Sequence, residues 1–329
     1  MSTFLRTLGR LAAAFACSAL ATPLAWAQAP CASGSTVKFL VPFPASGSSA
    51  DGLARAVSAE LAKMWGKTVI VENKPGAGGV ASTQAVATSA PDGCTVGLVT
   101  AAISINPSLM KKRLPYDTLK DLTMLSVLVD IPVGLFANPA LPFKTVPELL
   151  AYAKTVPQGL DYGTPGVGSG SHLAGELLAH MTGARLNHVP YRGAAPAELD
   201  LMAGRIPLMI VAVSSEVAQI KAGKVRLIAV TGDKRFSGFP DVPTIGETVP
   251  GYATPGYFGV VGPGGMDKGL ASRISQDIAK ALQMPEVKRQ LDMRGLVPIG
   301  STPEQFERLV RSEMQTLGRV VEATGMSTE

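Results

Sequence analysis

The sequence predicts an α/β fold of two lobes, each built on a doubly wound sheet flanked by helices. Short β-branched runs alternate along the chain with amphipathic helical patterns, which is typical of a parallel sheet with helices on both faces. Proline-rich segments at residues 131–132 and 249–255 divide this rhythm into two units. With 329 residues, 46% of them hydrophobic, the chain is long enough to bury a core in each unit.

The first lobe is expected to contain residues 28–130 and 253–329, and the second residues 131–252. In the first lobe, strands are predicted at residues 37–41, 68–71 and 95–99, with helices at residues 51–65 and 81–89. The stretch YFGVVGPGG and two or three amphipathic helices then complete that lobe. In the second lobe, strands are predicted at residues 133–137, 186–189, 208–213 and 225–230, and helices at 146–155, 172–182 and 196–203. The two crossings between the lobes predict a hinge.

The first 27 residues have the pattern of a signal peptide. Arg6 and Arg10 precede an apolar run at residues 11–24, and Ala25-Trp26-Ala27 is a small-x-small cleavage signal. The apolar run is interrupted and is short for a membrane span. The mature protein is therefore expected to begin near Gln28 and to be exported to the periplasm.

Charge and composition exclude several classes of partner. The chain has 30 basic and 25 acidic side chains, and loss of residues 1–27 would leave a net charge of +3. No run of like charges or basic-aromatic interleaving occurs, so nucleic acid and anionic membranes are not expected to bind.

The cysteines and histidines predict a disulfide but no metal site. Cys31 and Cys94 precede the first and third predicted strands, which are commonly neighbours in a doubly wound sheet, and an oxidising compartment favours their pairing. His172, His180 and His188 recur every eight residues, but Gly183 ends the helix before His188, so the three need not converge. Neither a metal nor another cofactor is predicted.

The stretch LDYGTPGVGSGSHLAGELL, residues 160–178, predicts an anion-binding loop. It follows a short strand and enters a helix, so glycines lie where free N–H groups and the helix dipole attract anions. A P-loop would need a lysine after Gly170, and a dinucleotide site would need an acid near Asn187 and His188. Gly168-Ser169-Gly170 also fails the nucleophile-elbow pattern, which favours a serine that caps the helix.

Two further loops join predicted strands to helices and are expected to meet the first at one edge, because ligand sites lie beyond the carboxyl ends of parallel strands. One is VPFPASGSSAD at residues 41–51, and the other follows the strand at residues 186–189. Three of the candidates have an alternative to ligand contact. Asp51 could be an N-cap, Tyr191 could pack at the lobe edge, and Arg192 could lie on a solvated face. The candidate ligand-binding residues are Phe43, Pro44, Ala45, Ser46, Gly47, Ser48, Ser49, Asp51, Thr164, Gly166, Gly168, Ser169, His172, Tyr191, Arg192, Gly193 and Ala194.

Several long motifs make the chain resemble a known family. VPFPASGSSADGLAR, VENKPGAGGVAS, YGTPGVGSGSHLAGELL and HVPYRGAAPAELDLMAG occur in order, and the chain resembles the Bug family of extracytoplasmic receptors of tripartite tricarboxylate transporters. The resemblance implies a two-lobed periplasmic binding protein of the Venus-flytrap type that closes on a small carboxylate. It also implies that backbone groups and ordered waters of these loops hold one carboxyl group, and that membrane components of a transporter are the partners of a monomeric receptor.

Departures from the family pattern limit what the resemblance implies. The first loop has Ser46 in place of a glycine and one extra residue, and Val211 occupies a place where many relatives carry aspartate. The missing acid beside the cleft makes an amino-acid ligand less expected. Two other functions stay open: an exported hydrolase using Ser169 or Ser171, and a ligand sensor for a signalling partner.

Overall fold

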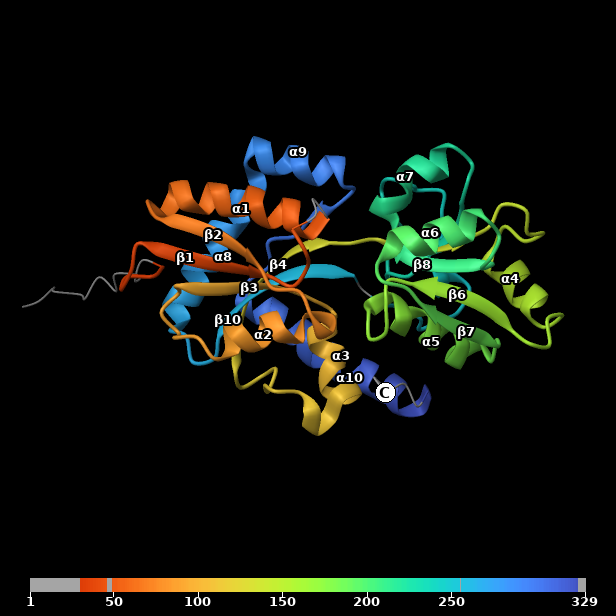
Figure 1. Cartoon of the computed structure of the whole chain (residues 1–329), viewed down its shortest axis with the longest axis horizontal. Helices are drawn as coiled ribbons and strands as arrows, with labels where there is room; N and C mark the ends of the chain where they lie inside the picture. Colours follow the sequence, from red (N-terminus) through yellow and green to blue (C-terminus); the bar gives the residue numbers. More distant parts are fainter. Residues whose placement is uncertain (1–29, 46–48, 255, 325–329) are drawn as a thin grey trace, which may run out of the picture.

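A computed structural model describes residues 30–45, 49–254 and 256–324. The expected signal peptide, together with Ser46, Gly47 and Ser48 of the first candidate loop, lies outside the described residues. The chain folds into two α/β lobes that lie side by side (Figure 1). Within the described residues, no helix combines the length and the apolar composition that a membrane crossing requires.

The first sheet has six strands in the order β11-β4-β10-β3-β1-β2. On one face of this sheet, α1, α8 and α9 pack against Phe39 and Leu98 in one apolar cluster. On the other face, α2, α3 and α10 pack against Leu40 and Val99 in a second cluster. Alternate residues of each strand thus enter different cores. The strands are β1 (Thr36–Val41), β2 (Thr68–Asn73), β3 (Thr95–Thr100), β4 (Leu122–Asp130), β10 (Tyr257–Pro263) and β11 (Val297–Pro298). The helices are α1 (Ser49–Trp65), η1 (Ala77–Gly79), α2 (Val80–Ala87), α3 (Ala102–Met110), η2 (Lys111–Arg113), α8 (Lys268–Gln283), α9 (Pro285–Met293) and α10 (Pro303–Thr324).

The second sheet has five strands in the order β7-β6-β8-β5-β9. Its α4 and α5 pack on one face and its α6 and α7 on the other, where Ala197 and Val213 join Phe136 in a separate apolar cluster. The strands are β5 (Val133–Ala137), β6 (Leu160–Thr164), β7 (Leu186–Pro190), β8 (Leu208–Ala212) and β9 (Arg226–Val230). The helices are α4 (Val146–Ala153), α5 (Gly170–Thr182), α6 (Ala194–Met202), α7 (Val213–Lys221) and η3 (Ile245–Glu247).

The two-lobed α/β class is confirmed, but the sheets are mixed rather than parallel. β1 runs parallel to β2 and β3, and β6 runs parallel to β7 and β8. In contrast, β10 is antiparallel to β3 and β4, and β5 is antiparallel to β8 and β9. The reason is that β5 and β10 directly follow the crossings. A strand that begins at the interlobe edge of a sheet must run away from that edge, opposite to the strands that end there. The strand β4 and the helices α3 and α7 were not among the predicted elements.

The two crossings between the lobes lie against each other. The Ile131 N–H donates to the Gly256 carbonyl at 2.7 Å, and the second crossing is also bonded to the end of β9, because the Thr254 N–H donates to the Thr231 carbonyl at 2.8 Å. A Cβ on Gly256 would lie only 2.5 Å from the Ile131 oxygen, so this close approach requires glycine. The α10 helix provides a further connection, because it packs on α3 of the first sheet and on α5 of the second.

Cys31 and Cys94, the pair expected from the sequence, are joined by a disulfide. The bond links the segment before β1 to the segment before β3, and these two strands are neighbours in the sheet. The bridged residues are 63 positions apart, so closing this loop in the unfolded chain stabilises the fold by on the order of 4 kcal/mol in the chain-entropy account.

A buried carboxyl group lies where α10 packs against α3 and β10. Glu313 is 5% exposed, and its Oε2 accepts hydrogen bonds from Ser104 Oγ at 2.6 Å and from the Tyr257 hydroxyl at 3.0 Å. Its Oε1 has no hydrogen-bond partner among the described residues. Burial raises the pKa of Glu313 to about 7, although these two hydrogen bonds oppose the shift.

Glu313 is expected to make the free energy of unfolding depend on pH. Because its folded pKa of about 7 exceeds the ordinary 4.5, the folded protein binds the extra proton, and stability falls as pH rises from 4.5 to about 7. In Glu313→Gln, urea unfolding should show on the order of 3 kcal/mol less of this fall. The exposed Glu322→Gln is the control. If the free energy of unfolding depends on pH in the same way in Glu313→Gln and in the wild type, folding does not raise the pKa of Glu313.

Candidate functional site

Two of the candidate loops are joined to each other at the carboxyl ends of β6 and β7. Residues 165–169, here called the glycine loop, connect β6 to α5, and residues 191–193 connect β7 to α6. The Tyr191 N–H donates to the Thr164 carbonyl at 3.0 Å, and the Gly193 N–H donates to the Pro165 carbonyl at 3.1 Å. The sequence prediction that these loops meet at one sheet edge therefore agrees with the observed hydrogen bonds.

Internal hydrogen bonds determine the shape of the glycine loop. Ser169 is the N-cap of α5: its Oγ accepts from the His172 N–H at 3.1 Å and donates to the Gly166 carbonyl at 2.8 Å. The Gly168 N–H donates to Nδ1 of the His172 ring at 3.2 Å. Gly168 has φ of 74°, which an L side chain rarely adopts. Gly168 is therefore a donor within the loop, and its N–H is not left for a ligand.

Three neighbouring N–H groups remain for a ligand. Those of Val167, Gly170 and Ser171 have no hydrogen-bond acceptor among the described residues. Gly170 and Ser171 begin α5, where the helix dipole favours an anion. None of these three residues was in the predicted set, although the N–H groups leading into His172 were expected to face the ligand. They follow from the position of the N-cap, because the first helical residues after Ser169 lack internal acceptors.

The loop after β7 supplies a second group of donors. Arg192 is exposed and has no acidic partner among the described residues, and the N–H groups of Ala194 and Ala195 have no acceptor in that part of the chain. Tyr191 instead faces α6, because its hydroxyl donates to Asp200 Oδ2 at 2.8 Å. Burial and this hydrogen bond raise the pKa of Tyr191 to about 12. The packing alternative is thus favoured for Tyr191.

In the loop after β1, the contacts of the described residues are mainly structural. The Asp51 carboxylate is buried, pairs with Arg55 Nε at 3.0 Å and accepts from Asn73 Nδ2 at 2.8 Å. Asn73 Nδ2 also donates to the Phe43 carbonyl at 2.9 Å. Asp51 lies in the first turn of α1, which Ser49 begins, and its carboxylate holds the loop to β2. Pro44 and Ala45 are exposed.

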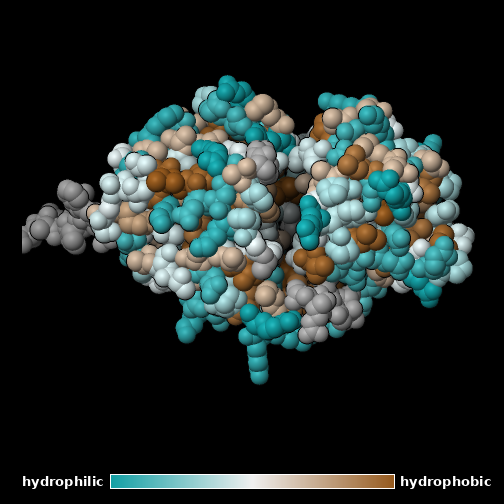
Figure 2. Space-filling view, in the orientation of Figure 1, coloured by the Kyte–Doolittle hydropathy of each residue, from teal (hydrophilic) through white to brown (hydrophobic). Residues whose placement is uncertain are grey.

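The two lobes meet beside these loops. A Cβ on Gly168 would lie 3.0 Å from Leu109 Cδ2 of α3, so the glycine loop approaches the first lobe closely. On the other side, Gly295 faces Phe236 and Ser214 of the second lobe. Figure 2 shows the surface hollowed into a groove between the two lobes.

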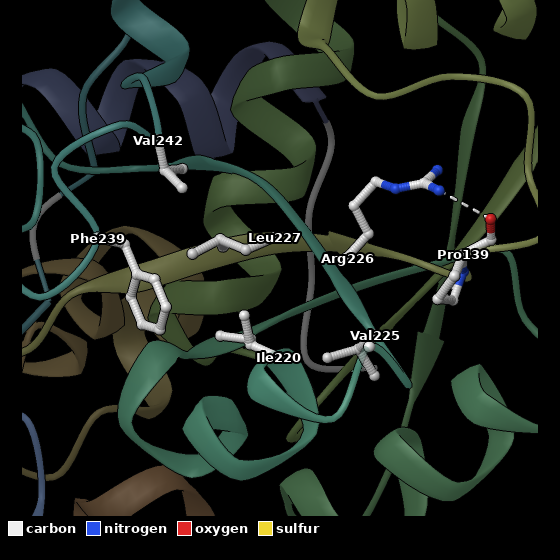
Figure 3. Close-up of a pocket in the computed structure, with 8 residues that line it drawn as sticks. Pro139, Ile220, Val225, Arg226, Leu227, Phe239 and Val242 are labelled. Carbon is white, nitrogen blue, oxygen red and sulfur yellow. Dashed lines mark hydrogen bonds between the residues drawn. The ribbon is translucent and has the colours of Figure 1, made fainter.

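A separate pocket lies at the other edge of the second sheet, at the start of β9 (Figure 3). Its lining is apolar except for Arg226, whose guanidinium donates to the carbonyl oxygens of Pro139, Leu141 and Phe143. Because the Arg226 guanidinium already donates its hydrogen bonds to these carbonyls, this pocket is a poorer carboxylate site than the loops. The lining residues are Pro139, Ile220, Gly223, Val225, Arg226, Leu227, Phe239 and Val242.

One sequence expectation needs correction. Val211 is fully buried in β8, opposite Gly134, and packs in the apolar core of the second lobe, so it does not line the cleft and says nothing about the charge of the ligand. Of the three histidines, His172 and His188 lie together, with their rings stacked and the centroids 3.7 Å apart, while His180 is exposed on α5. The parallel pairing of β6 with β7 places His188 beneath α5, which spacing along the sequence did not predict.

Two α/β lobes, joined by paired crossings and separated by a groove, define the class of two-lobed solute-binding proteins. The chain matches the model of a family described as the tripartite tricarboxylate transporter family receptor over residues 53–326, and it belongs to that family.

Similar proteins cover nearly the whole chain. The protein BugT of Bordetella pertussis is 34% identical over 292 residues, which are 88% of this chain and 89% of BugT. The structure of R. palustris Rpa4515 with adipate has a TM-score of 0.78 at 32% identity and covers 89% of this chain and 98% of that one. MatC from Rhodopseudomonas palustris with bound malate has a TM-score of 0.74 at 29% identity and covers 87% and 98%.

The glycine loop is expected to be essential for ligand binding. In Gly168→Val, a β-branched side chain at φ 74° and a Cβ 3.0 Å from Leu109 should displace the loop and abolish carboxylate binding in calorimetry. Ser169→Ala should keep the loop but cost about 1 kcal/mol of stability through the lost cap.

Gly183→Val is the matched control, because Gly183 ends α5 at φ 66° with no atom near its Cβ position. The control should lose stability but keep ligand affinity. Unchanged affinity in folded Gly168→Val protein would remove the glycine loop from the site.

Proposed function

We propose that this protein is a periplasmic receptor that binds a small carboxylate between its lobes and delivers it to the membrane components of a tripartite tricarboxylate-type transporter. The observation that carries the proposal is the set of N–H groups at Val167, Gly170 and Ser171, which lack acceptors in the described part of the chain. Backbone donors at a helix N-terminus bind a carboxylate without a metal or a dedicated cationic side chain. Family membership supports the same assignment.

The ligand is proposed to carry two carboxyl groups. One would bind the N–H groups of the glycine loop, and the other would bind Arg192 or the first N–H groups of α6. These second donors lie near the first because the loop after β7 is hydrogen-bonded to the start of the glycine loop. Two similar proteins were solved with adipate and with malate, and both compounds are dicarboxylates. The first lobe, proposed to comprise residues 28–130 and 253–329, would close over the ligand by bending at the paired crossings.

Export to the periplasm is supported by the signal-peptide pattern of residues 1–27 and by the disulfide, which oxidising compartments favour. Receptor function without chemistry is supported by the serine contacts. Ser169 Oγ is bonded to the Gly166 carbonyl and the His172 backbone, and the His172 ring accepts from Gly168 rather than from a serine hydroxyl. A serine nucleophile would instead need its proton to face the imidazole. We propose that the receptor acts as a monomer.

A ligand screen tests this function. Adipate, malate, citrate, benzoate and aspartate are compared by thermal shift and then by calorimetry, with adipamide as the uncharged control. A dicarboxylate should bind with micromolar or tighter Kd, and at 100 times its Kd it should stabilise the fold by about 2.7 kcal/mol. Adipamide should not bind. Tight binding of aspartate alone, or no binding by any carboxylate, would contradict the proposal.

A further inference from the structure

A cluster of polar side chains lies directly beneath the glycine loop and contacts it at two points. The cluster, here called the histidine cluster, comes from three neighbouring elements: β6, α5 and β7. None of the contacts described below involves the ligand donors at Val167, Gly170 and Ser171. The cluster consists of Tyr162, Thr164, His172, Glu176 and His188.

The hydrogen bonds of the cluster determine which nitrogen of His172 carries the proton. Because the Gly168 N–H donates to Nδ1, that nitrogen has a free lone pair, and the proton of the neutral ring is on Nε2. Nε2 faces Glu176 Oε1 at 3.7 Å. The nearby His172 ring is the main cause that holds the pKa of Glu176 below its ordinary value, and the hydrogen bond from Tyr162 contributes, so the carboxylate is ionised at neutral pH and attracts the Nε2–H group across this distance.

Tyr162 fixes the Glu176 carboxylate from below. Its hydroxyl donates to Glu176 Oε1 at 2.7 Å, and the ring is fully buried. The ring reaches this place only because residue 175 is glycine: a Cβ there would lie 2.2 Å from Tyr162 Cε2. Tyr162, Glu176, His172 and Gly168 thus form one chain of groups from the core of the lobe to the loop.

His188 supports the other end of the loop. Its ring stacks on His172 at 3.7 Å with an interplanar angle of 13°, and its Nε2 lies 2.6 Å from Thr164 Oγ1. Thr164 Oγ1 accepts in turn from the Gly166 N–H at 3.3 Å. Burial, with a contribution from His172, lowers the pKa of His188 to about 4, so the ring is uncharged at neutral pH. Because His188 carries no charge, the two rings can stack without charge repulsion.

We propose that Glu176 is a positioning residue: it holds His172 in the Nε2–H tautomer that accepts from Gly168, and so keeps the glycine loop in its ligand-binding shape. Without the carboxylate, the Nδ1–H tautomer becomes accessible. It would place a second donor against the Gly168 N–H and break that hydrogen bond. The effect on affinity rests on the proposed function, whereas the tautomer and the loop contact do not.

The test combines nitrogen NMR of labelled histidine rings, hydrogen exchange at the Gly168 amide and calorimetry with adipate and malate. In the wild type, His172 should show a protonated Nε2 and an unprotonated Nδ1. In Glu176→Ala the ring should populate both tautomers, and Gly168 exchange and ligand Kd should each rise on the order of tenfold. Glu176→Gln retains an acceptor oxygen and should restore the Nε2–H tautomer.

The exposed His180→Ala, on the same helix, is the control and should leave all three measurements unchanged. If Glu176→Ala does not fold, Tyr162→Phe, which removes one hydroxyl, should shift the tautomer in the same direction. A protonated Nδ1 in the wild type, or an unchanged ring and amide in Glu176→Ala, would overturn the proposal. If neither dicarboxylate binds the wild type, the proposed function fails, but the NMR and exchange results still decide the role of Glu176.

Discussion

The candidate site depends on one hydrogen bond, from the Gly168 N–H to Nδ1 of His172. It uses the N–H group of the glycine that turns the chain, and it leaves those of Val167, Gly170 and Ser171 for a ligand. A backbone N–H group without an acceptor costs free energy when it is shielded from water. A loop with three such groups must therefore be held in its shape by other contacts. The Ser169 cap and the histidine cluster provide those contacts.

The same reasoning applies to the lobes. Parallel strands place helix N-termini at the interlobe edge, whereas the strands that follow a crossing, β5 and β10, run away from it. The crossings are paired through Ile131 and Gly256, so motion between the lobes is concentrated at a few bonds. The α10 helix packs on both lobes, and its buried Glu313 is hydrogen-bonded to Ser104 of α3 and Tyr257 of β10. When the lobes close, the motion must therefore preserve the apolar core that α10 shares with both lobes, as well as the hydrogen bond between the crossings.

Local patterns of the sequence predicted most of the fold. The β-branched run at β1 and the helix signals of α1 and α5 gave elements within two residues of those observed. Strand direction in β5 and β10 was not predictable, because it depends on the side from which the chain enters a lobe. The loops of the proposed site, and free N–H groups at the start of α5, were also expected from the sequence, but the particular N–H groups that lack acceptors were not. The helix was predicted to begin at residue 172 but begins at Gly170, with Ser169 as its N-cap, and this difference of two residues decides which N–H groups are free. The stacking of His188 on His172 and the burial of Val211 depend on packing between elements, which periodicity does not encode.

A crystal structure of the complex with the tightest-binding dicarboxylate tests the central claim most directly. We predict that one carboxylate oxygen lies about 2.7–3.2 Å from the backbone nitrogen of Gly170 or Ser171, with the bond between Gly168 and His172 intact. A carboxylate bound elsewhere, with these N–H groups facing only water, would contradict the assignment of the glycine loop as the ligand-binding element.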